Sequence, residues 1–162
     1  MKNHIIILTA LFISFVTQIE VFAQSNKYTA LINELDTIDK KLNLYTGDLY
    51  NFEVTFINDN SDDYYIVKDV QEILAITQER IDAMYANMHL AQEIKDPLDQ
   101  SEVKSFLNSR AALYIKSTQL FFERMNYGLA KLSKPGVAYK VQMILDDMRT
   151  FIAILEKLDS VK

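Results

Sequence analysis

Apolar residues of this sequence recur at alternating intervals of three and four positions in four separate segments. Such spacing places them along one side of an α-helix, and its continuation over several heptads is typical of helices that pack against other helices. We call each set of positions, which includes a few small or hydroxyl residues, an inward stripe. The four stripes are Tyr28, Leu31, Leu35, Ile38, Leu42, Tyr45, Leu49, Phe52 and Phe56; Val67, Val70, Leu74, Thr77, Ile81, Met84, Met88 and Ala91; Leu107, Ala111, Tyr114, Thr118, Phe121, Met125, Gly128 and Leu132; and Val137, Val141, Ile144, Met148, Phe151, Leu155 and Leu158.

Short polar runs separate the four segments, at residues 58–62, 96–97 and 133–136. Asp96 is a suitable N-cap, and Pro97 suits the first helical position, where its missing N–H costs nothing. Connections this short favour antiparallel neighbours. The sequence therefore predicts an all-α protein, an antiparallel up-down-up-down four-helix bundle with helices at about residues 26–57, 62–94, 97–132 and 136–159. The alternative is a helical hairpin that completes its core with another chain.

Composition excludes several other classes of protein. The chain has 3 glycines and 2 prolines among 162 residues, too few for the many turns of a sandwich or barrel. It has no cysteine, which excludes disulfides, thiolate metal sites and a cysteine nucleophile.

The beginning of the sequence has the pattern of a secretory signal peptide. A short basic start is followed by an apolar run from Ile5 to Val16 and then by Val21-Phe22-Ala23. The run is shorter than the roughly 20 residues that span a bilayer. We therefore expect cleavage before Gln24, a single domain at residues 24–162 and a periplasmic or secreted protein that is not inserted in a membrane.

The inward stripes contain none of the residues from which bundles build catalytic or metal centres. They hold no carboxylate and no histidine, and the one histidine after residue 23 is His89, beside inward Met88. We expect His89 at the surface, and Met84 and Met88 in the core rather than on a metal or haem. No catalytic, cofactor or metal residue is predicted, so we expect the protein not to be an enzyme.

The third segment carries a second apolar row that an ordinary core does not require. Four residues at seven-residue spacing form this row, which we call the outer stripe: Phe106, Leu113, Leu120 and Tyr127. Cations including Arg110 and Arg124 separate it from the inward stripe. In one interpretation a neighbouring helix covers the outer stripe, and in the other it is an exposed surface for a partner, since interfaces are enriched in aromatic residues and arginine.

Charge limits the choice of partner. Residues 24–96 hold 14 acids and 6 bases, a net charge of −8, and residues 97–162 hold 7 acids and 10 bases, a net charge of +3. The net charge of residues 24–162 is therefore −5. This balance disfavours nucleic acid and anionic membranes.

The sequence therefore predicts a non-enzymatic exported protein. It would be an inhibitor or immunity-type protein, an adaptor, or a subunit of an envelope assembly. We expect it to bind another protein, or a second copy of itself, through six residues: Phe106, Arg110, Leu113, Leu120, Arg124 and Tyr127. The alternative is a carrier of a small apolar ligand in the bundle interior, suggested by the mixture of small and bulky residues in the third inward stripe.

Overall fold

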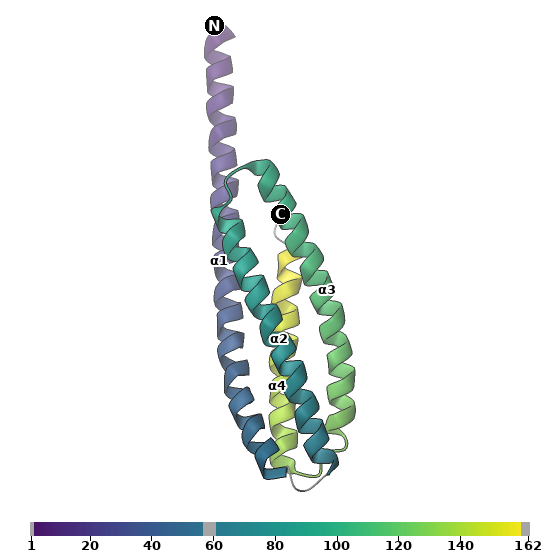
Figure 1. Cartoon of the computed structure of the whole chain (residues 1–162). Helices are drawn as coiled ribbons and strands as arrows, with labels where there is room; N and C mark the ends of the chain where they lie inside the picture. Colours follow the sequence, from purple (N-terminus) through teal and green to yellow (C-terminus); the bar gives the residue numbers. More distant parts are fainter. Residues whose placement is uncertain (1, 57–60, 160–162) are drawn as a thin grey trace.

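A computed structural model describes residues 2–56 and 61–159, with side chains at residues 28–56, 61–96 and 98–158. It contains four helices, α1 (Lys2–Phe56), α2 (Asp62–Glu93), α3 (Pro97–Leu129) and α4 (Pro135–Asp159), and no strand within those residues (Figure 1). The prediction of an all-α chain with four helices is confirmed.

The helices form a ring in which each packs mainly against two others. Helices α1 and α3 each contact both α2 and α4. In Figure 1 the end of α1, the start of α2 and the α3–α4 connection lie at one end of the bundle, and the α2–α3 connection lies at the other. Side-chain contacts between the first two helices agree with this path, since Gln92 near the end of α2 donates to Thr29 and Gln78 in its middle donates to Asn43.

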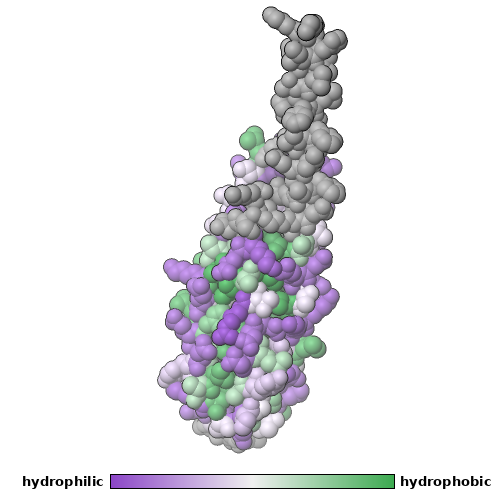
Figure 2. Space-filling model, turned by 180° about the vertical axis from the view of Figure 1, so that it is seen from behind, coloured by the Kyte–Doolittle hydropathy of each residue, from purple (hydrophilic) through white to green (hydrophobic). Residues whose placement is uncertain are grey.

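The inward stripes form most of the core, together with Ile32, Ile73, Leu145 and Ile154. Every one of their residues is buried or half-buried, and Leu35, Leu42 and Leu49 of α1 are completely buried. Fully burying a leucine stabilises the fold by about 1.5–3 kcal/mol relative to leaving it exposed. On the side opposite to that of Figure 1, hydrophilic residues are spread over the surface with apolar residues between them (Figure 2).

The start of α3 follows from its N-cap. The Asp96 carboxylate accepts hydrogen bonds from the backbone amides of Leu98 at 2.8 Å and Asp99 at 3.4 Å, and Pro97 occupies the first turn. The end of α3, at Leu129, comes three residues before the predicted end at residue 132. There the amide of Lys131 turns back to the carbonyl of Gly128, and the chain is drawn toward α2.

At the other end of the chain, α1 begins at Lys2 rather than near residue 26. The predicted signal peptide, residues 1–23, lies outside the residues whose side chains are described. Within the described part of the chain, no helix combines the length and apolar character needed to cross a membrane.

Candidate protein interface

The outer stripe of α3 lies on the surface. Phe106 is 44% exposed, Leu113 54%, Leu120 59% and Tyr127 67%. The interpretation in which a neighbouring helix covers these side chains is therefore wrong. Within the described residues, the main neighbours of α3 are α2 and α4, and the side of α3 that carries the outer stripe is left exposed.

Contacts of α3 with α2 show which flank carries the stripe. Arg124 forms an ion pair with Asp69 of α2 and lies 3.8 Å from a carboxylate oxygen of Glu72. Arg124 belongs to the row between the inward and outer stripes. The outer stripe therefore lies just outside the line along which α2 and α3 pack together, which we call the α2–α3 seam.

Helix α2 extends the apolar surface on the other side of this seam. Ile76 and Leu90 stand seven and 21 residues after Asp69, hence on the same side of α2 as Asp69, which faces α3. Counting forward along α2 and backward along α3 from the Asp69–Arg124 pair places Ile76 near the level of Leu120 and Leu90 near that of Phe106. Ile76 is half-buried and Leu90 is 55% exposed.

We call this combined surface the α2/α3 face. It consists of six apolar residues and four cations: Ile76, Leu90, Phe106, Leu113, Leu120 and Tyr127, with Arg80, Arg110, Arg124 and Lys131.

Three cations of the α2/α3 face lie against aromatic rings. The Arg110 guanidinium is 5.2 Å from the centre of the Phe106 ring, and the Lys131 ammonium is 4.0 Å from that of Tyr127. Arg80 lies 4.7 Å from the centre of the Phe121 ring, and its burial lowers the pKa of the guanidinium. Among the described residues, none of these three cations forms an ion pair.

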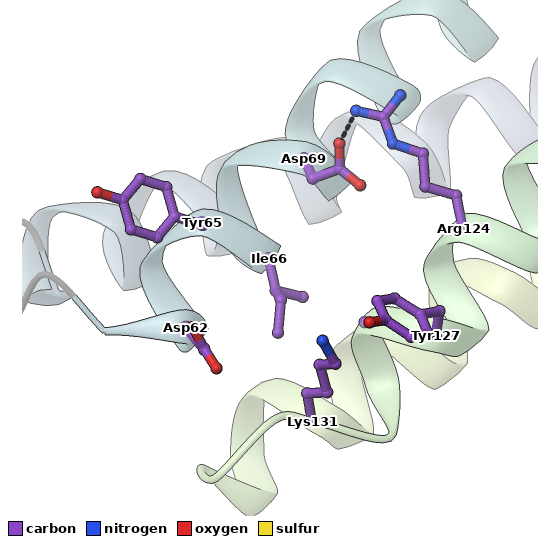
Figure 3. Close-up of a pocket in the computed structure, with 8 residues that line it drawn as sticks. Asp62, Tyr65, Ile66, Asp69, Arg124, Tyr127 and Lys131 are labelled. Carbon is purple, nitrogen blue, oxygen red and sulfur yellow. Dashed lines mark hydrogen bonds and ion pairs between the residues drawn. The ribbon is translucent and has the colours of Figure 1, made fainter.

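An open pocket of about 430 Å³ lies at the Tyr127 end of the face (Figure 3). Its lining comes from both helices: Asp62, Tyr65, Ile66, Asp69, Arg124, Tyr127, Gly128 and Lys131. Gly128 lets the helices approach closely here, because a Cβ atom at this position would lie 3.0 Å from Cγ2 of Ile66. A small residue of the third inward stripe is thus used for close packing of α2 against α3.

The seam between α1 and α4 has a different chemistry, which the sequence reasoning missed. Buried Asp147 accepts a hydrogen bond from the Tyr45 hydroxyl at 2.6 Å and lies 2.9 Å from the Lys41 ammonium. Burial and the bond to Asp147 raise the pKa of Tyr45. Lys140 of α4 in turn lies 2.7 Å from Asp48 of α1. These contacts join two helices, and the shallow hollow of about 330 Å³ beside Asp147 opens at the surface.

A sequence signal for the α1–α4 seam does exist. Lys41 and Asp48 are separated by one heptad, as are Lys140 and Asp147, and both pairs flank an inward stripe. Opposite charges at such flanking positions pair across helices, which determines which helices become neighbours.

A second buried carboxylate, Asp63, holds the α3–α4 connection in place through Ser133. It accepts hydrogen bonds from the Ser133 amide at 2.8 Å and the Ser133 hydroxyl at 2.6 Å. This contact accounts for the early end of α3, because it holds Ser133 against the first turn of α2.

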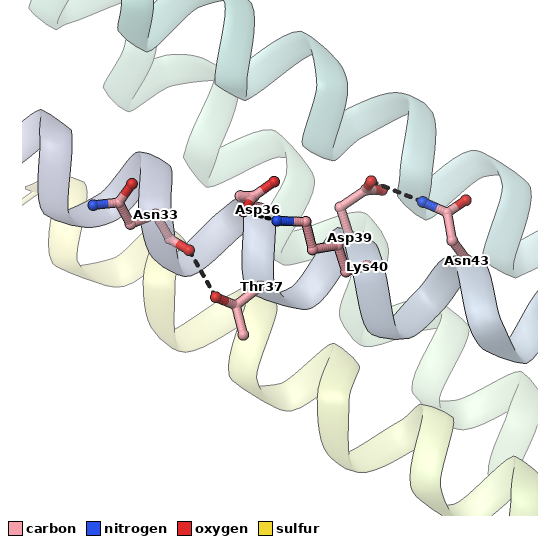
Figure 4. A network of polar contacts seen from close by, with 6 residues as sticks. All are labelled: Asn33, Asp36, Thr37, Asp39, Lys40 and Asn43. Atoms are coloured by element: carbon pink, nitrogen blue, oxygen red, sulfur yellow. Dashed lines mark hydrogen bonds and ion pairs between the residues drawn. The ribbon is translucent and has the colours of Figure 1, made fainter.

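The acidic side of α1 offers no comparable site. Asp36 pairs with Lys40, and Asp39 accepts a bond from Asn43, each one helical turn away (Figure 4). Partial burial, followed by the nearby carboxylate of Asp82, raises the pKa of Asp39. In the part of the chain that the structure describes, no group of three or more histidine, aspartate or glutamate side chains is placed to hold a metal ion.

His89 is exposed, as predicted, with its ring centre 4.5 Å from that of Tyr85. Met84 and Met88 are completely buried in the core.

Comparisons with protein-family models, curated proteins and solved structures found no match to this chain.

Proposed function

We propose that this chain is a non-enzymatic protein that binds another protein through the α2/α3 face. The observation that supports the proposal is the exposure of Phe106, Leu113, Leu120 and Tyr127 in one continuous row. Soluble monomers rarely expose large continuous apolar patches without a function, and aromatic residues with arginine are the composition that interfaces favour. Inhibitors, adaptors and subunits of an envelope assembly all use such a surface.

The dimensions of the face suit a protein partner. Phe106 and Tyr127 are 21 residues apart, which corresponds to about 32 Å along a helix. Two helices with axes about 8–10 Å apart give a strip of roughly 300 Å² between the axes, the size of the apolar patches on monomers that are often functional.

We also propose that the protein acts outside the cytoplasm, as an up-down-up-down heptad bundle formed by residues 24–162. The sequence pattern of residues 1–23 supports this proposal. The test is the amino-terminal sequence of the protein isolated from the envelope and medium fractions of its native host. We expect Gln24 as the first residue, and a cytoplasmic protein that retains Met1 would refute export.

Site-specific photo-crosslinking in the native host tests the binding surface. A photoreactive residue at Leu113 or Leu120 should give the same covalent adduct of defined mass, whereas one at Leu44 should not. Leu44 is a matched control because its side chain is 72% exposed on α1, away from the face. Light scattering of the purified adduct, with mass spectrometry, separates a foreign partner from a second copy of the chain.

A pair of charge substitutions supplies the second part of this test. Leu113→Asp with Leu120→Asp should abolish the adduct formed from a photoreactive residue at Tyr127 while helicity and urea resistance stay unchanged. The control, Leu44→Asp with Leu98→Asp, adds the same charge at residues that are also exposed. An adduct that survives Leu113→Asp with Leu120→Asp would refute the proposed surface.

A further inference from the structure

We infer that the partner presents an amphipathic helix whose apolar seam is flanked by carboxylates, and that this helix lies along the α2/α3 face. This inference rests on the proposed function and specifies the chemistry of the partner. Its basis is the spacing of the apolar residues, the partners of the cations and the position of the pocket.

The spacing of the outer stripe matches a helix. Phe106, Leu113, Leu120 and Tyr127 repeat every seven residues, so the row runs nearly parallel to the axis of α3. Ile76 and Leu90 provide a second, parallel line on α2. A partner helix laid over the outer stripe meets an apolar side chain of α3 at each heptad and has the row of Arg110, Arg124 and Lys131 along one edge.

The cations of the face specify carboxylates on that helix. The cations at the α1–α4 seam already have carboxylate partners, since Lys41 pairs with Asp147 and Lys140 with Asp48. Arg110 and Lys131, in contrast, rest on exposed aromatic rings. Each therefore retains hydrogen-bond donors for a carboxylate that arrives with the partner.

The same cations disfavour a second copy of the chain on this face. A two-fold dimer brings the same surface patch of both subunits together. Arg110 and Lys131 would then meet cations of the other copy, and the exposed carboxylate of the pocket lining, Asp62, already lies near Lys131 of its own chain. A foreign helix with glutamate or aspartate beside its apolar seam avoids this repulsion.

The pocket beside Tyr127 supplies an anchor point at one end of the helix. Its lining includes Tyr65, Ile66 and Tyr127, together with the cations Arg124 and Lys131 and the carboxylates Asp62 and Asp69. A single apolar side chain of the partner fits this arrangement, with a carboxylate one turn away toward Lys131. Interfaces typically concentrate binding energy in such partly enclosed aromatic pockets.

Two designed peptides test the inference directly. Both have about four heptads with leucine at the a and d positions, and they carry either glutamate or lysine at every e and g position, which keeps each peptide from pairing with itself. Binding to protein purified after expression of the full-length chain is followed by fluorescence anisotropy at low and high salt. We expect the glutamate peptide to bind at least about ten-fold more tightly than the lysine peptide, with an affinity that falls as salt increases.

Variants then separate the two proposals. Arg110→Gln with Lys131→Gln should weaken binding of the glutamate peptide by about ten-fold and reduce its salt dependence. The control, Lys95→Gln with Lys116→Gln, removes the same charge from two exposed positions outside the face and should change affinity by less than about two-fold. Leu113→Asp with Leu120→Asp should abolish binding.

Equal affinities for the two peptides, or equal effects of the two glutamine pairs, would overturn the inference about carboxylates. The proposed function survives that result if Leu113→Asp with Leu120→Asp still abolishes the photo-crosslinked adduct in the host. If that pair of substitutions changes neither the peptide binding nor the adduct, both proposals fail.

Discussion

Removing the hydrogen bond between Tyr45 and Asp147 should destabilise the bundle by an amount that can be estimated from its surroundings. The two residues are 7% and 8% exposed, and their side-chain oxygens are 2.6 Å apart. A hydrogen bond to a charged group contributes about 1.5–3 kcal/mol. We therefore expect Tyr45→Phe to lower the free energy of unfolding by about 2 kcal/mol.

The partner substitution should cost more. Asp147→Ala leaves the Tyr45 hydroxyl without its acceptor and also removes the ion pair with Lys41, whose side chain is 50% exposed. We expect a loss of about 2–4 kcal/mol, of which the ion pair contributes at most about 1 kcal/mol. In the double variant the two losses overlap, so it should be more stable than their sum implies, by about 1.5–3 kcal/mol.

Urea unfolding followed by far-ultraviolet circular dichroism measures all four free energies of the double-mutant cycle. Tyr50→Phe is the control, because Tyr50 is a tyrosine of α1 that is 62% exposed, and its substitution should change stability by less than about 0.5 kcal/mol. A coupling energy between Tyr45 and Asp147 of less than about 0.5 kcal/mol would refute the reasoning.

Three further predictions concern pH and helix contacts. The pKa of Tyr45 is raised above its ordinary value of 10.0, so the folded state retains a proton that the unfolded state loses. Stability should therefore fall as the pH rises above about 10, and less steeply in Tyr45→Phe, as measured by urea unfolding across that pH range. Gly128→Ala should destabilise the protein by about 1 kcal/mol, because the added Cβ would meet Ile66. In an Ile66→Ala background the same change should instead stabilise the protein by about 1 kcal/mol, because alanine has the higher helix propensity. Thermal unfolding measures both effects. Ser133→Ala should cost about 1–2 kcal/mol in urea unfolding, because it removes a hydrogen bond to buried Asp63.

Each of these has a matched control or a contrary result. Tyr50→Phe alters a tyrosine that is 62% exposed and should leave the alkaline slope unchanged. An effect of Gly128→Ala that is the same in both backgrounds would show that Ile66 does not limit the space. Ser105→Ala, at an exposed position of α3, should be neutral, and an equal loss there would remove the special role of Ser133.

The inward faces of the helices could be predicted because helical periodicity is a local property of the sequence. Thr77 and Thr118 illustrate how far this holds, since both were assigned to the core on spacing alone and both are completely buried. The Thr77 hydroxyl donates to the Ile73 carbonyl one turn earlier, so the helix itself satisfies the polar group.

The environment of the outer stripe was not predictable from local spacing. Whether Leu113 and Leu120 are covered depends on which helices become neighbours of α3, and that is decided by contacts such as Arg124 with Asp69, 55 residues away. The predicted end of α3 was wrong for the same reason, because the bond between Ser133 and Asp63 joins residues 70 positions apart.

The contacts that close the ring of helices connect the first helix with the last. Tyr45 and Asp147 are separated by 102 residues, whereas the α1–α2 bond between Asn43 and Gln78 spans 35. Contacts close in sequence form first, because the loop that must be ordered is shorter. As the chain emerges during synthesis, α1 and α2 can pair while the flank of α1 with Lys41, Tyr45 and Asp48 is still exposed to water. That flank is covered only when α4 has been made, so the last helix completes the folding of the first.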